Sequence, residues 1–267
     1  MIKKRDHELR VGALAHFEDP AFYAHTYRAR VEDIAYYTQL AREFAGKRAA
    51  ILEYGIGAGR VAISMAHAGA TVFGVDHSRP MLDDLARKLK SEPREVRARI
   101  HARFGDMRRV RLARKFPLVV APFNVLLHLY ERADVEAFLA RVREHLAPRG
   151  LFVMDLSVPM PEDLARDPLR PLRAPRFKHP SAGVVRYREF FDYDRARQIL
   201  FVTMEMTPEK NPRGTFVVPL AQRQFFPREW EALLHYNGFW IEHWFGDYSR
   251  GPFDTSSEVM VIHARAR

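Results

Sequence analysis

Cysteine is absent from the 267 residues. Its absence excludes disulfides, thiolate metal ligands and cysteine nucleophiles, and it fits the reducing environment of the cytoplasm. Spacings that are typical of metal sites, such as H-E-x-x-H, are also missing. We therefore expect a cytoplasmic protein that holds no metal ion.

Long apolar runs are missing as well. No run approaches the roughly 18 residues that a membrane-spanning helix needs. The basic start, MIKKRDHELR, is not followed by the apolar segment of a signal peptide. There is no internal repeat and no low-complexity tract. The length and the 47% hydrophobic content suit one large α/β domain with an insertion, and no membrane partner is expected.

Negative charge is in deficit, because the chain carries a formal net charge of +10. Such a charge suggests nucleic acid as a partner. However, the 43 Lys and Arg residues are mostly Arg and are scattered over the whole length, a bias that codon usage in a GC-rich genome explains as readily as a binding face does. The densest cluster, residues 108–115, falls in one predicted loop. Nucleic acid is therefore not the partner that we expect.

The most informative segment of the chain is residues 51–76, ILEYGIGAGRVAISMAHAGATVFGVD. An apolar run over 49–52 predicts a buried strand, a glycine-rich turn follows, a helical pattern comes next, and a β-rich run over 71–75 ends in Asp76. This order is that of a βαβ unit. Glycines let the backbone of the turn pass close to a ligand, and the free N–H groups of the helix, from about Arg60 on, point at it. An acid that closes the second strand can accept hydrogen bonds from a ribose.

The glycine spacing distinguishes between classes of ligand. Dinucleotide-binding turns read G-x-G-x-x-G, whereas this turn reads G-x-G-x-G, with Glu53 two residues before the first glycine. It resembles motif I, E/D-x-G-x-G-x-G, of the class I S-adenosylmethionine-dependent methyltransferases. The resemblance implies that Gly55, Gly57 and Gly59 cradle the amino-acid end of S-adenosyl-L-methionine and that Asp76 holds its ribose hydroxyls. The alternative is a turn whose glycines only allow helix packing.

Three later segments extend the resemblance. The phrase after Asp76 is similar to D-x-S-x-x-M-L, and the step G-D-M follows a strand expected over 96–104. A strand over 116–122 runs into F-N-x-x-x-H-L, which resembles motif IV of small-molecule N- and O-methyltransferases. The cofactor contacts that the resemblance implies are Arg30, Glu53, Gly55, Gly57, Gly59, Arg60, Asp76, His77, Met81, Asp106, Met107, Phe123 and Asn124.

The end of the strand over 116–122 is where we expect chemistry. Ligands of open α/β sheets bind beyond the carboxyl ends of the strands, where the strand order reverses. Asn124 and His128 are four residues apart, so they share a face if the chain turns helical there. His128 would act as a base or as a hydrogen-bonding guide for the nucleophile. A half-buried histidine that bonds a backbone carbonyl is the alternative.

The N-terminal region is expected to be a polar, weakly ordered lead over 1–20 and one helix over 23–44 that ends at Gly46. The sequence FYAHTYRAR resembles the lid helix of small-molecule methyltransferases. The resemblance implies that Tyr23 and Tyr27 face the reaction centre and that Arg30, or else Arg28, reaches the methionyl carboxylate. An ordinary amphipathic helix is the alternative.

Five strands that alternate with helices predict a Rossmann-like, doubly wound α/β sheet. After residue 159 we expect a loop to residue 180, with a short helix over 161–166, and then antiparallel strands over 183–193, 199–207 and 215–226. This insertion after the fifth strand resembles the cap of glycine and sugar N-methyltransferases. A helix from Pro227 and strands over 239–248 and 258–264 would complete a seven-stranded sheet with a reversed last strand. The predicted domains are a lid (1–46), a core (47–158 and 227–267) and a cap (159–226).

Taken together, the resemblance implies an S-adenosylmethionine-dependent methyltransferase that acts on N or O of a small molecule bound between core, cap and lid. Arg186, Arg188 and Arg223 alternate with aromatic residues on the cap strands and could receive an anionic substrate, unless they are only the solvated faces of those strands. The main alternative is an RNA or protein methyltransferase that uses the basic surface. A regulatory module that binds cofactor without catalysis and a NAD-dependent oxidoreductase are further alternatives, the latter opposed by the glycine spacing. A homodimer is left open.

Overall fold

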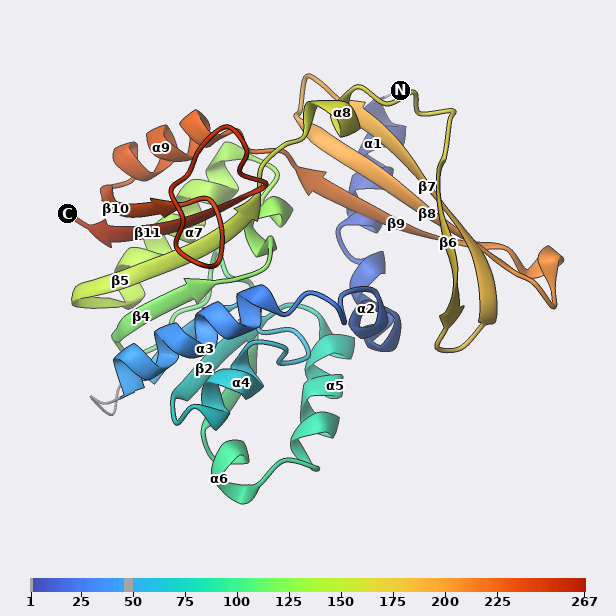
Figure 1. The fold of residues 1–267 in the computed structure, drawn as a ribbon. Coiled ribbons are helices and arrows are strands. Elements are labelled where there is room, and N and C mark those ends of the chain that lie inside the picture. Colours follow the sequence, from blue (N-terminus) through green and yellow to red (C-terminus); the bar gives the residue numbers. More distant parts are fainter. Residues whose placement is uncertain (1, 46–49) are drawn as a thin grey trace. The chain divides into compact units, whose positions relative to one another are not determined.

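The computed structural model describes residues 2–45 and 50–267. Contacts between residues divide the chain into two compact units. The first unit comprises residues 1–29 and 159–224, and the second comprises residues 30–158 and 225–267 (Figure 1). In the described residues, no helix is long and apolar enough to cross a membrane.

The second unit is built on a mixed seven-stranded sheet with the strand order β10-β11-β5-β4-β1-β2-β3. Strands β1 to β5 pair in parallel, whereas β11 is antiparallel to both of its neighbours. The predicted Rossmann-like sheet with a reversed last strand is confirmed. Its strands are β1 (Ala50–Tyr54), β2 (Thr71–Asp76), β3 (Ile100–Phe104), β4 (Phe116–Ala121), β5 (Leu146–Ser157), β10 (Phe239–Phe245) and β11 (Val259–Ala266).

Helices cover both faces of this sheet (Figure 1). Side chains of successive strand residues point to opposite faces, so Leu52 joins one apolar cluster and Ile51 the other. The first cluster includes Phe138 and Trp230, and the second includes Tyr37. The helices are α3 (Glu32–Ala45), α4 (Ala62–His67), α5 (Arg79–Leu89), α6 (Arg94–Arg97), the 3₁₀ turn η2 (Val125–His128), α7 (Arg132–His145) and α9 (Pro227–Tyr236).

The strand order reverses between β1 and β4. Strand β1 pairs in parallel with β2 on one side and with β4 on the other, so that Glu53 lies opposite both Gly74 and Val120. The carboxyl ends of the three strands therefore lie side by side. In open α/β sheets this edge is where ligands bind.

The first unit contains an antiparallel four-stranded sheet with the order β6-β7-β8-β9, as expected for three of the four strands. Its apolar face buries Val185 and Met206, and Phe22 packs on the same cluster. The strands are β6 (Leu172–His179), β7 (Gly183–Asp194), β8 (Ile199–Pro208) and β9 (Phe216–Arg223), and the helices are α1 (Ile2–Gly12), η1 (Ala15–Phe17), α2 (Pro20–Thr26), α8 (Pro161–Leu164) and η3 (Pro212–Gly214).

The prediction of a weakly ordered lead over 1–20 is wrong, because α1 and η1 occupy most of it. Helix α1 is held to the sheet of its unit by polar contacts. Arg5 donates to Asp192 at 2.7 Å, and Arg197 donates to Asp6 at 3.0 Å. These partners lie almost two hundred residues apart in the chain, so no local pattern could indicate them.

The single helix predicted over 23–44 is also wrong, because the chain forms α2 and α3 with a break between them. Helix α2 begins at Pro20, where the Asp19 carboxylate accepts a hydrogen bond from the Phe22 amide at 2.9 Å. An acid followed by proline is a common helix start, and it competes with the longer apolar pattern. The break separates Tyr27, in the first unit, from Arg30, in the second. Gly46, the predicted end, lies outside the described residues.

Other boundaries differ less. Strand β6 lies inside the predicted loop over 159–180, because a chain rich in Pro and Arg can still form an edge strand. Strand β3 begins at Ile100, since α6 takes up the residues before it, and β5 begins already at Leu146. The proposed roles of a lid, a core and a cap stay predictions.

A glycine outside the motif, Gly74, is required for the close packing of the βαβ unit. Gly74, in β2, faces Ile56 of the turn, and a Cβ at this position would lie 2.2 Å from its Cδ1 and 2.7 Å from its Cβ. The backbone of Gly74 is ordinary strand, so the constraint is steric. The turn after β1 can therefore sit over β2 only if residue 74 has no side chain.

We expect Gly74→Ala to lower the free energy of unfolding by about 1–3 kcal/mol, because the added methyl group overpacks this contact. Urea unfolding of Gly74→Ala, Ile56→Ala and the double variant measures the effect. The double variant should be clearly more stable than the sum of the two changes implies. Additive changes would show that the two residues do not compete for space.

Candidate functional site

The glycine turn adopts the backbone that its sequence predicts. Gly55, Gly57 and Gly59 have φ values of 73°, 51° and 79°, in the left-handed region that favours glycine. A Cβ at Gly55 would lie 2.3 Å from Val125 of η2, and one at Gly59 would lie 2.5 Å from Leu85 of α5. These two glycines are therefore required for packing within the protein, besides any contact with a ligand.

Gly57 differs from its neighbours, because the nearest atom to a Cβ there would be the flexible end of Met81, at 3.2 Å, followed by the Asp76 carboxylate and the Gly55 carbonyl oxygen, both at 3.9 Å. Its N–H donates to Asp76 Oδ2 at 2.8 Å. The turn is therefore tied to the end of β2, with Met81 at the start of α5 beside it. The residue type at position 57 leaves open a space that a side chain would fill.

The Asp76 carboxylate accepts hydrogen bonds from Gly57 N and, through Oδ1, from Ser78 N at 2.8 Å. Burial raises the pKa of Asp76, while these backbone donors oppose the rise. His77 is exposed, with its Nδ1 4.0 Å from Asp76 Oδ1. Each carboxylate oxygen has a second lone pair, so the group can also accept from ligand hydroxyls.

Glu53, at the end of β1, is 2% exposed. Burial raises its pKa well above the usual range, with Asp76 and Asp33 adding to the rise and Arg60 opposing it. Its Oε2 has no hydrogen-bond partner within the described part of the chain. A buried polar atom without a partner is unusual and suits a site that a donor from a ligand completes.

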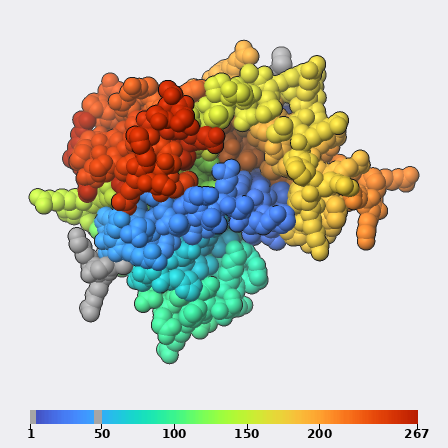
Figure 2. Space-filling view, viewed as in Figure 1, coloured from blue at the N-terminus to red at the C-terminus, as the bar shows by residue number. Residues whose placement is uncertain are grey.

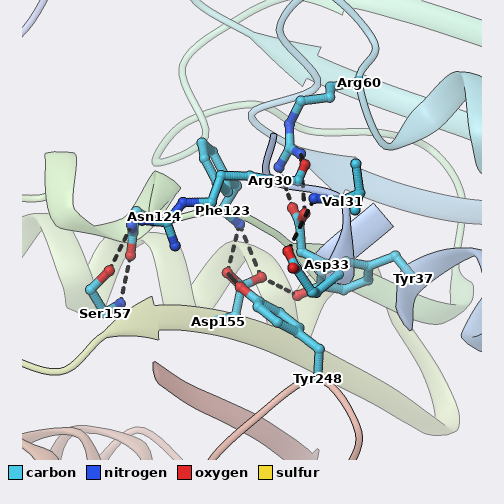
Figure 3. A network of polar contacts seen from close by, with 11 residues as sticks. Arg30, Val31, Asp33, Tyr37, Arg60, Phe123, Asn124, Asp155, Ser157 and Tyr248 are labelled. Carbon is cyan, nitrogen blue, oxygen red and sulfur yellow. Dashed lines mark hydrogen bonds and ion pairs between the residues drawn. The ribbon is translucent and has the colours of Figure 1, made fainter. Parts of the chain in front are cut away.

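Arg60 follows the turn and is held on three sides. It forms an ion pair with the buried Asp33 of α3, donates to the Arg30 carbonyl at 2.8 Å, and lies over the Phe123 ring at 4.0 Å (Figure 3). Arg30 thus contributes its backbone carbonyl to this contact, while its side chain is exposed. Arg60 links α3 to the segment after β4.

A third carboxyl group at these strand ends, that of Asp155 near the end of β5, was not among the predicted site residues. It is 1% exposed and accepts from Tyr37 Oη at 2.6 Å, from Tyr248 Oη at 2.8 Å and from the Phe123 amide at 2.9 and 3.0 Å (Figure 3). Burial raises the pKa of Asp155 to about 6, although these donors oppose the rise. The only sequence signal is an acid inside the apolar run LFVMDLS.

Asn124 does not share a helical face with His128, so that expectation is wrong. Its side chain is paired with Ser157, whose N donates to Oδ1 at 2.7 Å and whose Oγ accepts from Nδ2 at 3.0 Å. The residue has φ 62° and precedes a 3₁₀ turn, in which positions three apart align rather than four. His128, at the end of that turn, is half-buried, with its Nδ1 3.2 Å from Tyr130 Oη. Tyr130 is a neighbour that the motif did not indicate.

The carboxylate of Asp106, one of the predicted cofactor contacts, is already bound by other groups of the protein. Asp106 accepts from the Arg108 amide at 2.9 Å and from its guanidinium at 2.8 Å, and Arg108 also reaches Asp134 at 2.6 Å. Burial alone would raise the pKa of Asp106, but the bonds from Arg108 outweigh it and lower the pKa. Met107 packs against the apolar cluster on this side of the sheet.

In the first unit, Tyr23 and Tyr27 lie together, with ring centroids 4.8 Å apart. Both rings contact His16, which is 1% exposed and whose Nε2 lies 3.0 Å from Tyr27 Oη. Burial lowers the pKa of His16 to about 4, so its imidazole is neutral at physiological pH. Sequence reasoning missed His16, because nothing near it forms a motif.

The three cap arginines have different surroundings. Arg186 is exposed, Arg188 donates to Glu205 at 2.8 Å across the neighbouring strand, and Arg223 donates to the Gln224 carbonyl at 2.8 Å. Their predicted role toward an anionic substrate stays a prediction. No group of three or more metal-ligating side chains occurs in residues 2–45 and 50–267.

Part of the chain is similar in sequence to known proteins. Residues 51–150 match a family model described as a methyltransferase domain. Over 129 residues, the chain is 32% identical to dTDP-3-amino-3,6-dideoxy-alpha-D-glucopyranose N,N-dimethyltransferase of Streptomyces fradiae. The aligned residues make up 48% of this chain and 46% of that protein. The chain thus spans about half the length of the curated relatives it matches.

Solved structures match over more of the chain. The CcbJ methyltransferase of Streptomyces caelestis superposes with a TM-score of 0.74 at 25% identity, covering 88% of this chain and 89% of that one. The glycopeptide N-methyltransferase MtfA, in complex with S-adenosyl-L-homocysteine, gives a TM-score of 0.60 at 25% identity, covering 86% and 87%. The similarity therefore extends beyond the residues of the family model to both units.

The buried Asp155 makes the stability of the fold depend on pH. The folded protein binds this proton more tightly than the unfolded chain does, because its pKa is raised from 3.8 to about 6. The contribution of Asp155 to the free energy of unfolding therefore falls as the pH rises from about 4 to about 6, by about 3 kcal/mol. Asp155→Asn removes this titration.

The stability of Asp155→Asn relative to the native protein should therefore increase by up to about 3 kcal/mol between about pH 4 and pH 7. Urea unfolding at a series of pH values measures this difference. The exposed Asp83→Asn is the matched control, and its stability relative to the native protein should stay nearly constant. A constant difference for Asp155→Asn as well would mean that the carboxyl is not buried in the folded state.

Proposed function

We propose that the chain is a class I S-adenosylmethionine-dependent methyltransferase and that it transfers a methyl group to an amino nitrogen of a small molecule. An amino sugar is the substrate class that its similarity to an amino-sugar N,N-dimethyltransferase favours. Nitrogen is preferred over oxygen because the glycopeptide enzyme is also named as an N-methyltransferase.

The observation that carries the proposal is the paired arrangement of Gly57 and Asp76 at the carboxyl ends of β1 and β2, beside the point where the strand order reverses. The residues there fit the cofactor. Position 57 leaves space that a Cβ would fill, Asp76 has acceptor capacity for ribose hydroxyls, and the buried Glu53 Oε2 can accept from an ammonium group. A cationic ligand beside the buried carboxyl groups of Glu53 and Asp76 would favour their ionised forms and so counter the rise that burial causes in their pKa values.

When bound, S-adenosyl-L-methionine supplies an electrophilic methyl group on a sulfonium, whose departure needs no acid. The residues of the chain have to orient the nucleophile and exclude water from it. The residues proposed to hold the cofactor are those of the predicted set: Arg30, Glu53, Gly55, Gly57, Gly59, Arg60, Asp76, His77, Met81, Asp106, Met107, Phe123 and Asn124.

His128 is the proposed proton acceptor for the substrate amine. A neutral imidazole has one N–H and one acceptor nitrogen. The 3.2 Å contact between Nδ1 and Tyr130 Oη orients the imidazole, and the ring nitrogen that carries no proton is the one that would accept the proton of the substrate. The catalytic roles of Tyr23 and Tyr27 stay predictions.

Methylation of RNA or protein through the basic surface is not favoured. Much of the positive charge is paired with carboxylates, for example Arg111 with Glu144 and Arg176 with Glu209. Paired arginines are less available to phosphates than a clustered basic face would be.

Cofactor binding is the most direct prediction. Calorimetry should show S-adenosylhomocysteine binding and no binding of NAD. Gly57→Val should abolish binding, because its side chain fills the space beside Met81. Asp76→Ala should weaken binding by about 1–3 kcal/mol, as expected when hydrogen bonds to a charged acceptor are lost.

Gly69→Val is the matched control for this series. Gly69 also has a positive φ, 97°, but a Cβ there meets nothing within 4 Å. It should lose stability through backbone strain while the folded protein keeps its affinity. Binding of NAD without binding of S-adenosylhomocysteine would overturn the proposed function.

The reaction itself is tested with methyl-labelled cofactor and a panel of amino sugars, other small amines, phenols and RNA. Label should pass to an amino sugar or another small amine. Transfer to RNA alone, with a steep dependence on salt, would replace the proposal by its alternative.

For His128→Ala we expect turnover to fall by about 10²–10⁴, with the affinity for S-adenosylhomocysteine changed only a few-fold, because the residue acts on the substrate proton. Tyr130→Phe should have a smaller effect in the same direction, since the imidazole loses one orienting contact. His67→Ala, an exposed histidine paired with Glu92, is the control. Loss of stability with full turnover per folded molecule would identify His128 as a structural residue.

A further inference from the structure

The segment after β4 has an unusual backbone. Phe123 and Asn124 have φ values of 56° and 62°, and two consecutive residues with side chains rarely adopt the left-handed region. Such a conformation persists only where the surroundings hold it. The conformation of these two residues therefore depends on specific contacts with the surrounding chain.

Most of these contacts come from Asp155. Its carboxylate accepts from the Phe123 amide at 2.9 and 3.0 Å, and its carbonyl accepts from the Asn124 amide at 3.2 Å. Ser157, two residues further along β5, pairs with the Asn124 side chain. The end of β5 thus holds both strained residues by backbone and side chain (Figure 3).

The Asp155 carboxylate is itself fixed from two other elements. Tyr37 of α3 donates to Oδ1, and Tyr248, in the segment after β10, donates to Oδ2. Three donors converge on a group that, when ionised, only accepts. The outer surfaces of α3 and of the segment after β10 adjoin one another (Figure 2). Arg250 of that segment pairs with Glu43 of α3 at 2.7 Å.

The segment that Asp155 holds reaches the proposed cofactor and base residues. Phe123 lies under the Arg60 guanidinium, and Val125 fills the space beside Gly55. Both residues lie on the short path from β4 to His128. A shift of the Phe123 backbone would therefore change the environment of the glycine turn and the start of η2 together.

We propose that Asp155 is a positioning residue, which holds Phe123 and Asn124 in the conformation that cofactor binding and methyl transfer require. The positioning of Phe123 and Asn124 is inferred from the hydrogen bonds. Its effect on cofactor binding and methyl transfer rests on the proposed function. Asp155 does not have to touch either reactant. It acts through the backbone of Phe123.

The protonation of Asp155 should control this contact. The groups that face it are Tyr37 and, one turn earlier on α3, Asp33, with Arg60 paired to Asp33, and Tyr248 from the segment after β10. Burial raises the pKa of Asp155 to about 6, and the Asp33 charge adds to the rise. Below this pH the carboxyl gains an O–H where three donors already converge, so the Phe123 contact should loosen.

Hydrogen exchange of the segment 120–130, followed by mass spectrometry at neutral pH, tests the geometry. Asp155→Asn should speed exchange in this segment several-fold while leaving β1 and β2 unchanged, because an amide cannot accept from all three donors. Tyr248→Phe should have a smaller effect of the same kind. Tyr36→Phe is the matched control, because Tyr36 is the buried neighbour of Tyr37 but bonds His263 instead of Asp155.

The affinity for S-adenosylhomocysteine between about pH 5 and 7.5 tests the consequence. The affinity of the native protein should fall several-fold below about pH 6. The affinity of Asp155→Asn should be weak at every pH and should not show this fall. The control variant Tyr36→Phe should show the same dependence of affinity on pH as the native protein.

Three outcomes would overturn the proposal: unchanged exchange in Asp155→Asn, faster exchange throughout the second unit, or an unchanged pH profile of affinity. The second outcome would reduce Asp155 to a structural residue. Failure of the proposed function is recognised separately. In that case S-adenosylhomocysteine does not bind to the native protein, while Asp155→Asn still changes exchange in the segment 120–130.

Discussion

The parallel pairing of β1 with β2 on one side and β4 on the other is the constraint on which the site depends. It brings the carboxyl ends of three strands to one edge, although the chain visits them in separate crossovers. The glycine turn can leave β1 at that edge because Gly74 offers no side chain beneath Ile56. The segment after β4 reaches the same edge, where Val125 packs against Gly55. Gly55 is thus needed for packing and is also one of the residues proposed to hold the cofactor.

Buried acids end the strands at this edge. Burial raises the pKa of Glu53 on β1, Asp76 on β2 and Asp155 on β5. In each case hydrogen-bond donors or a neighbouring cation oppose this rise in pKa. Carboxyl groups in an apolar sheet are unfavourable unless something compensates them. For Asp155 the compensation is internal, from two tyrosines and a backbone amide. Glu53 lacks such a donor at Oε2, and a cationic cofactor would provide it.

Sequence patterns predicted the core well, because strands of a parallel sheet are apolar runs and the glycine motif is local. The sequence patterns failed where the local structure depends on contacts with residues that are distant in the chain. The N-terminal elements differ from the predicted ones because Asp19 and Pro20 begin α2 and because α1 contacts its sheet, and β6 (Leu172–His179) forms despite its proline and arginine content. Asp155 was missed because its partners lie on α3, after β4 and after β10. His16 was missed because it acts through packing with Tyr23 and Tyr27 and belongs to no motif.

A crystal structure of the complex with S-adenosylhomocysteine tests the central claim most directly. The account predicts that the amino-acid end of the ligand lies against Gly57, with its amino group within hydrogen-bond distance of Glu53, and that both ribose hydroxyls donate to Asp76. Phe123 and Asn124 should keep their left-handed backbone, with the Phe123 amide still bonded to Asp155. A ligand bound elsewhere, or one whose ribose does not contact Asp76, would contradict the account.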